Sequence, residues 1–151
     1  MELDDLYQEL ILDHHKHPRG RGTIIAPDGQ ESLFNPLCGD EVRVSIKQKV
    51  GAESLEQVAF DGQGCSISQA SASMMSELCQ GQSIEKAHEL VQLFTKMMKG
   101  EASSEEIKEL GDAVSLEGVQ KFAARIKCAM LAWEAMEKCL GQLKSKHSSA
   151  A

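Results

Sequence analysis

The 151-residue chain carries 16 basic and 23 acidic residues, and its net charge of −7 argues against nucleic-acid binding, which needs a basic face. Its hydrophobic content of 42% can form one core, and its length fits a single domain, expected over residues 1–151. The sequence lacks the pattern of a signal peptide, and no stretch approaches the roughly 18 apolar residues of a membrane span. We therefore expect a cytoplasmic protein with no membrane partner, in which the five cysteines are core residues, metal ligands or reactive thiols rather than disulfides.

The N-terminal segment has the pattern of an amphipathic helix that should stop near Pro18. The apolar residues that recur at helical spacing, with acidic residues between them, are Leu3, Leu6, Tyr7, Leu10 and Ile11. His14, His15 and His17 look like a ligand cluster, but adjacent residues on a helix diverge. This favours the interpretation of the three histidines as a solvated helix end.

A strand hairpin is predicted in the next part of the chain. Residues 18–37 contain all three prolines and should be mostly loop, with a weak strand signal around 32–34. Apolar and polar residues then alternate over 42–47, as in a strand with one buried and one wet face. A β-branched and aromatic run at 55–60 follows the turn at 51–53, which predicts an antiparallel hairpin.

Helical segments make up the rest of the chain. Small residues at 66–78 allow a helix packed closely against a flat surface such as a sheet, and Ser83 can cap a second helix. Residues 100–121 mix charge, glycine and short apolar pairs, so short helical turns joined by loops are expected. A last helix is predicted at 123–140, ending at a glycine, with a disordered tail from about residue 142.

These elements predict an α+β fold in one domain. A small antiparallel sheet of about three strands should pack against several helices, which form a single layer on one face of the sheet.

Cys38 and Asp40 suggest the first half of a metal site. They lie two residues apart in a turn favoured by proline and glycine. Cys65 follows a glycine-rich run and Cys128 lies far downstream, and we hypothesise that these four residues converge on one ion. Thiolates suit zinc, copper(I) and iron–sulfur clusters, and a carboxylate can complete a tetrahedral zinc site. The gaps of 27 and 63 residues between the cysteines are too long for a zinc-finger knuckle, so spacing alone makes a weak motif.

Each cysteine also has a simpler interpretation. Cys38 could be a small buried residue, but its place in a Pro/Gly turn favours function. Cys65 could equally serve packing; as a functional residue at a helix start, its thiol pKa would be lowered by the helix dipole. Cys128, in mid-helix, is of a type more often found in the core, and Cys79 and Cys139 are best interpreted as structural. Asp40 alone would more often cap a turn. The methionine pairs are expected in the core: Met74, Met75, Met97 and Met98.

Four segments carry motifs of a known family. They are Asn-Pro-Leu-Cys-Gly-Asp at 35–40, Gly-Gln-Gly-Cys-Ser-Ile-Ser at 62–68, Arg-Ile-Lys-Cys-Ala at 125–129 and Asp-His-His-Lys-His-Pro-Arg at 13–19. In these motifs nearly the whole chain resembles the U-type iron–sulfur cluster assembly proteins, which include IscU, SufU and the NifU N-terminal domain.

One position points to a branch of this family. IscU-type scaffolds have a histidine before the third cysteine, where this chain has Lys127. The gap before Cys128 is also longer than expected for IscU, which implies an insertion around 95–115. Both features resemble the SufU branch.

The resemblance implies a zinc ion held by Cys38, Asp40, Cys65 and Cys128, and a role as sulfur acceptor for a SufS-type cysteine desulfurase. In this hypothesis a histidine of the desulfurase takes the place of Cys38 on the metal, and the freed thiolate attacks the partner's persulfide. The sulfur then passes to downstream iron–sulfur assembly proteins. Arg125 could assist the thiolate or orient the partner, with a surface salt bridge as the alternative.

Two other functions remain open from the sequence. One is a scaffold on which a [2Fe–2S] cluster is built and passed on. The other is a purely structural zinc domain, which would unfold without its metal.

Overall fold

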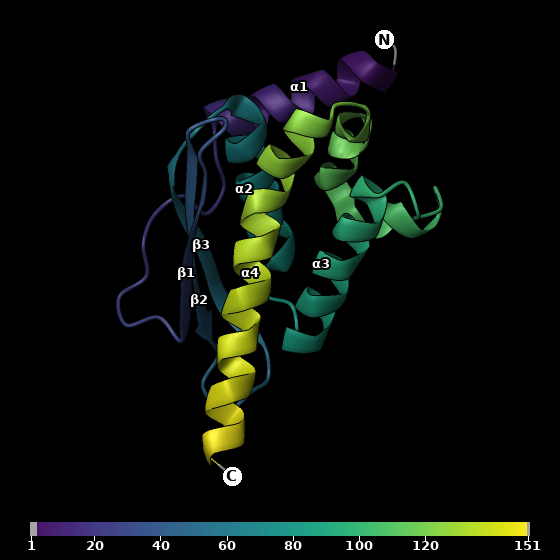
Figure 1. Ribbon diagram of the computed structural model, residues 1–151. Helices are drawn as coiled ribbons and strands as arrows, with labels where there is room; N and C mark the ends of the chain where they lie inside the picture. The colour runs from purple at the N-terminus through teal and green to yellow at the C-terminus, as the bar shows by residue number, and fades with distance from the viewer. Residues whose placement is uncertain (1–2, 151) are drawn as a thin grey trace.

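A three-stranded antiparallel sheet and its helices form the structure, a computed structural model that describes residues 3–150 (Figure 1). The strands are β1 (Gly29–Asn35), β2 (Asp40–Gln48) and β3 (Leu55–Gln63), in the order β1-β2-β3. The helices are α1 (Leu3–Lys16), α2 (Ser66–Cys79), α3 (Ile84–Met98), the 3₁₀ helix η1 (Glu106–Lys121) and α4 (Ala123–Ala150). The predicted α+β class is confirmed. Within the described residues, no helix is both long and apolar enough to span a bilayer.

Strand β1 is longer than the sequence indicated. The segment 18–37 was expected to be mostly loop, yet seven of its residues pair with β2, from Gly29 opposite Ile46 to Asn35 opposite Asp40. The polar composition of β1 hides this strand, which forms because it pairs with β2 and packs against α4. The result is a tight β1–β2 hairpin whose connecting turn contains Cys38.

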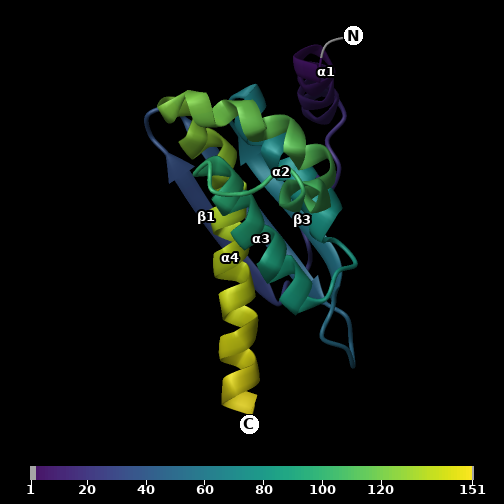
Figure 2. The ribbon, with the colours of Figure 1, turned by 90° about the vertical axis from the view of Figure 1, so that its right-hand side faces the viewer.

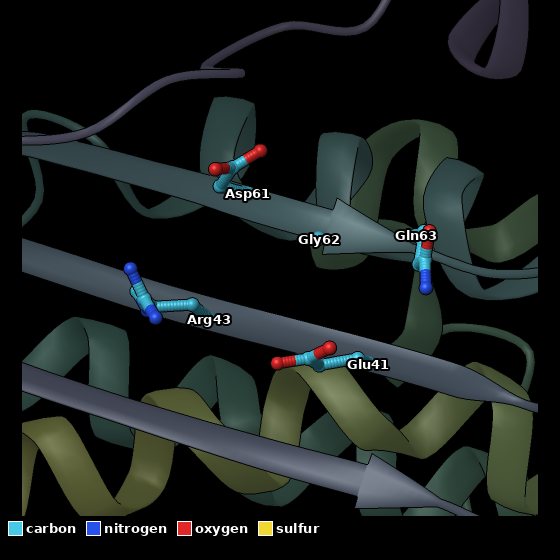
Figure 3. Close-up of a pocket in the computed structure, with 5 residues that line it drawn as sticks. All are labelled: Glu41, Arg43, Asp61, Gly62 and Gln63. Atoms are coloured by element: carbon cyan, nitrogen blue, oxygen red, sulfur yellow. The ribbon is translucent and has the colours of Figure 1, made fainter.

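The predicted hairpin of β2 and β3 is confirmed. Buried and exposed side chains alternate from Asp40 to Val44, but Ser45, at a position predicted to be wet, is buried, so the predicted alternation is confirmed for only part of β2. Val42 and Val44 are fully buried on the inner face. The outer face is polar: Figure 3 shows Glu41 and Arg43 on β2 beside Asp61 on β3, around a shallow pocket. The helices therefore pack against the apolar face of the sheet only.

The helix layer expected against the sheet is formed by α2 and α4, which contact the strands, while α3 packs on α4 and η1. Figure 2 shows α3 and α4 in front of the strands. Ser71 joins α2 to α4, because its hydroxyl donates to the carbonyl oxygen of Ala129 (2.6 Å) and accepts from Trp133 Nε1 (2.9 Å). Trp133 in turn stacks on Phe94 of α3, with ring centroids 4.2 Å apart. The predicted core methionines are buried: Met74, Met75, Met97 and Met98.

The short helical turns predicted over residues 100–121 are confirmed, because η1 consists of two 3₁₀ stretches that meet at a kink at Gly111, whose φ of 56° suits glycine. Helix α4 differs from its predicted form. It runs to Ala150, so the end predicted near residue 140 is wrong. A single interior glycine costs a helix only about 1 kcal/mol. Contacts just beyond it offset this cost, since Leu143 is buried and Gln142 hydrogen-bonds to the start of the sheet.

Helix α1 is attached to the body by a polar residue. His14 is the buried residue of α1, so the interpretation of the histidines as a solvated helix end is wrong for His14. His15 and His17 are exposed. The His14 ring is buried because Ser73 and Asp112 supply the hydrogen bonds that water would otherwise make.

Candidate metal centre

Cys38 lies at the tip of the β1–β2 hairpin. The pairing of Asn35 with Asp40 closes a four-residue turn, in which the Cys38 N–H donates to the carbonyl oxygen of Asn35 (3.3 Å). The Leu37 N–H also donates to Asn35 Oδ1 (3.3 Å), and Gly39 supplies the positive φ of 68° that the turn needs. Leu37 is 78% exposed and Cys38 is partly exposed. The turn therefore presents the Cys38 thiol at the surface.

Asp40, in contrast, is fully buried at the start of β2. Its Oδ1 accepts hydrogen bonds from the Cys65 N–H (2.8 Å) and from Ser68 Oγ (3.1 Å). Its Oδ2 is buried and has no hydrogen-bond partner. A Cβ on Gly64 would collide with Asp40 Oδ1 and lie 2.6 Å from Ser68 Oγ, so glycine is required for this close approach. The carboxylate is thus held by one oxygen while the other remains free to bind a ligand.

Cys128 joins Cys38 and Asp40 from helix α4. Its Sγ lies 3.3 Å from Cys38 Sγ, and Asn35 Nδ2 donates to it at 3.9 Å. One ligand atom from each of Cys38, Asp40 and Cys128 lies within 4.8 Å of the other two. Burial, followed by contacts with Asp40 and Cys38, raises the pKa of the Cys128 thiol well above its usual range. The fold thus brings together three of the four residues predicted as ligands.

Cys65 lies next to this group but outside it. It is the N-cap residue of α2, as the sequence suggested, and its Sγ accepts a hydrogen bond from the Ser68 N–H (3.5 Å). Its thiol also contributes to raising the pKa of Cys128, so the two side chains are near neighbours.

Arg125 lies at the mouth of the site, exposed to solvent. The negative charges that the thiolates of Cys65 and Cys128 carry when ionised raise the pKa of Arg125 above its usual value. By reciprocity, its guanidinium favours those thiolates. A pocket of about 640 Å³ opens beside it, between α1, α2, η1 and α4, with Tyr7 and Phe122 among its lining residues.

The donor set fits a zinc ion. Cysteine sulfur and carboxylate oxygen are both zinc ligands, so three thiolates and one carboxylate can complete a tetrahedral zinc site. The buried Asp40 Oδ2, which lacks a hydrogen-bond partner, is a further sign of a metal site. A buried oxygen without a hydrogen bond or a bound ion costs free energy of folding. The other two cysteines, Cys79 and Cys139, are fully buried in the hydrophobic core and lie outside this group of ligands. Their predicted structural role is confirmed.

Three residues of the site escaped the sequence analysis. Asn35 and Ser68 orient Cys128 and Asp40, and Gly64 makes room for them. Ser68 has a signal in the sequence, since a helix N-cap residue and the residue three positions later often interact. Asn35 has one too, because asparagine before a turn commonly bonds to the backbone two residues on.

Comparison with known proteins places this geometry in a family. A family model of the NifU-like N-terminal domain matches residues 6–129. The chain belongs to this family. Within it, the zinc-dependent sulfurtransferase SufU of Bacillus subtilis (strain 168) is 45% identical over 139 residues, covering 90% of each chain. The iron–sulfur cluster assembly scaffold protein IscU of Streptococcus pyogenes serotype M1 is 40% identical over 141 residues, covering 92% of this chain and 85% of that one.

A solved structure supports the same assignment. The crystal structure of a candidate iron–sulfur cluster assembly scaffold protein for the SUF system, from Fervidobacterium islandicum AW-1, superposes with a TM-score of 0.81 at 30% identity, covering 92% of this chain and 99% of that one. The NifU-like chain described here is therefore an iron–sulfur cluster assembly protein of the IscU/SufU group.

Proposed function

We propose that the protein is a zinc-binding sulfur acceptor, which takes persulfide sulfur from a cysteine desulfurase of the SufS type and passes it to downstream iron–sulfur assembly proteins. The observation that carries this proposal is a difference in exposure among the candidate ligands. Asp40 and Cys128 are fully buried, whereas Cys38 lies on an exposed hairpin tip. A ligand that must leave the metal and meet a partner's sulfur should be the accessible one.

By this criterion Asp40 and Cys128 are the retained ligands of the zinc, and Cys38 is its exchangeable ligand. Cys65 is partly exposed, as Cys38 is, but it lies at the N-cap of α2 rather than on the hairpin tip, and we assign it to the retained ligands. When bound, zinc keeps the thiols deprotonated and masks Cys38 from other electrophiles. Arg125 then adds a positive charge at the mouth of the site, where it favours thiolates.

The transfer itself is a thiol–disulfide exchange at Cys38. Its thiolate attacks the terminal sulfur of the partner's cysteine persulfide, and a sulfur–sulfur bond forms on Cys38 as the partner's sulfur–sulfur bond breaks. The partner's cysteine leaves as a thiolate, and the proton stays with the transferred sulfur. No oxidant is required, because the oxidised sulfur is moved rather than generated.

The similarity to SufU supports zinc over a cluster. The relative from B. subtilis is named as a zinc-dependent sulfurtransferase, and Lys127 stands where the IscU branch has a histidine ligand. The second candidate function is a scaffold for a [2Fe–2S] cluster, favoured by the 40% identity to the IscU protein of S. pyogenes. That function would give iron–sulfur absorbance after anaerobic reconstitution, followed by transfer to an apo-protein.

The test combines metal content with desulfurase turnover. We expect about one zinc per chain after purification, and a faster steady-state release of alanine from cysteine when the protein is added to the desulfurase. With Cys38→Ser, the desulfurase should still form its own persulfide in a single turnover but should no longer be stimulated. Iron in place of zinc, or equal stimulation by Cys38→Ser and wild type, would reject the proposal.

A further inference from the structure

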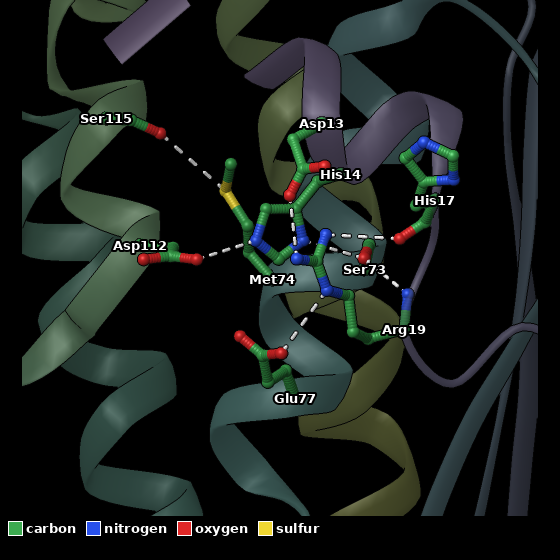
Figure 4. A network of polar contacts seen from close by, with 9 residues as sticks. All are labelled: Asp13, His14, His17, Arg19, Ser73, Met74, Glu77, Asp112 and Ser115. Carbon is green, nitrogen blue, oxygen red and sulfur yellow. Dashed lines mark hydrogen bonds and ion pairs between the residues drawn. The ribbon is translucent and has the colours of Figure 1, made fainter. Parts of the chain in front are cut away.

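A second group of metal-ligating side chains lies away from the cysteines, around His14 (Figure 4). The imidazole is fully buried at the end of α1. Its Nδ1 is 2.7 Å from Ser73 Oγ on α2, and its Nε2 is 2.8 Å from Asp112 Oδ2 on η1. Glu77, one turn after Ser73 on α2, places a carboxylate oxygen within 4.8 Å of both His14 and Asp112. One nitrogen and two oxygens from three different helices thus lie within 4.8 Å of one another.

The charge of this group is unbalanced. Asp13, Glu77 and Asp112 contribute three carboxylates, and Arg19 is the guanidinium that faces them. Arg19 is engaged chiefly by Asp13, at 2.7 Å, and this hydrogen bond lowers the pKa of Asp13. Its contact with Glu77 is longer, at 3.4 Å. Three carboxylates thus face one guanidinium, and this excess of negative charge suits a divalent cation.

Ser73 can form a hydrogen bond with either neutral tautomer of the His14 imidazole. Its Oγ accepts a hydrogen bond from the Arg19 backbone N–H (2.8 Å) and faces His14 Nδ1. When Nε2 carries the proton, the Ser73 hydroxyl donates to Nδ1; when Nδ1 carries it, the second lone pair of Oγ accepts. The latter arrangement leaves the Nε2 lone pair free for a metal. Ligating histidines usually have such a hydrogen bond on the other ring nitrogen.

We infer that His14, Glu77 and Asp112 form a second cation site, which binds a divalent first-row transition ion such as Mn²⁺ through one imidazole nitrogen and two carboxylates. These ligands suit harder ions than the thiolates of the first site do. Asp112 and Glu77 have side chains that are 40% and 48% exposed, so an ion can enter from solvent. Bound there, the ion would join α1 to both α2 and η1.

The test is a titration of the full-length protein, as purified, with Mn²⁺, followed by the loss of the free-ion signal in electron paramagnetic resonance. Mn²⁺ is chosen because it has little preference for thiolates, so the result does not depend on the cysteine site. We expect one Mn²⁺ per chain and a Kd at least tenfold higher in Glu77→Gln and in Asp112→Asn. The matched control is Glu109→Gln, an exposed acid of η1 that pairs with Lys86, which should bind Mn²⁺ as the wild type does.

The variants are expected to fold, so a loss of Mn²⁺ binding reports on the site itself. Asp112→Asn retains an oxygen that can accept from His14 Nε2, so the fold should persist, as circular dichroism can verify. Paramagnetic broadening provides a second measurement: amide signals should broaden most strongly around His14, and this broadening should weaken in Glu77→Gln but not in Glu109→Gln. Absence of stoichiometric binding at millimolar Mn²⁺, or equal Kd values in all variants, would overturn the inference and would leave the proposed sulfur transfer unaffected.

Discussion

Replacing Asp40 by asparagine should change the metal-free and the zinc-bound protein in opposite directions. In the metal-free protein, Asp40 Oδ2 is buried without a hydrogen-bond partner. Asparagine keeps Oδ1, so the bonds from the Cys65 N–H and Ser68 Oγ remain, and it places an NH₂ group where the lone oxygen was. That group can donate to the neighbouring sulfur atoms. The charge is removed, and with it the cost of an unsatisfied acceptor.

The size of the effect follows from these contacts. An unsatisfied buried acceptor costs about 1–3 kcal/mol, so the free energy of unfolding of metal-free Asp40→Asn should rise by about that amount. For a chain of this length each kcal/mol corresponds to about 2–4 °C in Tm. Zinc affinity should fall by more than the roughly 10- to 100-fold that outer-shell changes cost. A hundredfold loss would remove about 2.7 kcal/mol of zinc-linked stability.

Two measurements on Asp40→Asn check this reasoning. Urea unfolding after chelation gives the stability of the metal-free form, and competition with a chromophoric chelator gives the zinc affinity. A variant that is less stable than wild type without metal, and that binds zinc equally well, would show that Asp40 is a structural turn residue. It would also refute the interpretation of Oδ2 as a ligand atom.

Three further changes test the surroundings of the site and of η1. Ser68→Ala removes one of the two donors that hold Asp40, so zinc affinity should fall about 10- to 100-fold in the chelator assay, with little change in the far-ultraviolet circular dichroism. Asn35→Ala removes the side-chain bond that fixes the hairpin turn, so alkylation of Cys38 by iodoacetamide in metal-free protein should be several times faster; an unchanged rate would contradict this role. A hydrogen bond from a backbone N–H lowers the pKa of Glu106 from 4.5 to about 2, so its contribution to stability is present above pH 4.5 and is lost as the pH falls toward 2. Thermal unfolding of Glu106→Gln should therefore differ from wild type at pH 6 and converge with it near pH 2.

Much of the fold follows from local patterns in the sequence. The alternation in β2 and the aromatic run in β3 identify a hairpin, since one face of it is buried by helices. The full length of strand β1, of which only residues 32–34 gave a weak signal, and the end of α4 were not predicted, because both are stabilised by contacts distant in sequence. Gln142 of α4 bonds to the backbone of Gln30 in β1, across more than a hundred residues. Local propensity contains no information about such a pair.

The candidate site likewise contains residues that local sequence patterns predict and residues that they do not. Cys38 and Asp40 could be predicted because proline and glycine mark their turn. The resemblance to a family, rather than spacing, linked them to Cys65 and Cys128. His14 was interpreted as solvated because helical periodicity gives the direction of a side chain but not its partner. Its partner Asp112 lies far along the chain, after the kink at Gly111.

The central claim is that Cys38 accepts the sulfur, and mass spectrometry of the protein after incubation with desulfurase and cysteine tests it most directly. The expected result is an added sulfur atom, or more than one, on the peptide that contains Cys38, and none on the peptide that contains Cys128. The Cys38→Ala variant should carry no added sulfur. Persulfide that persists unchanged in Cys38→Ala would contradict the account.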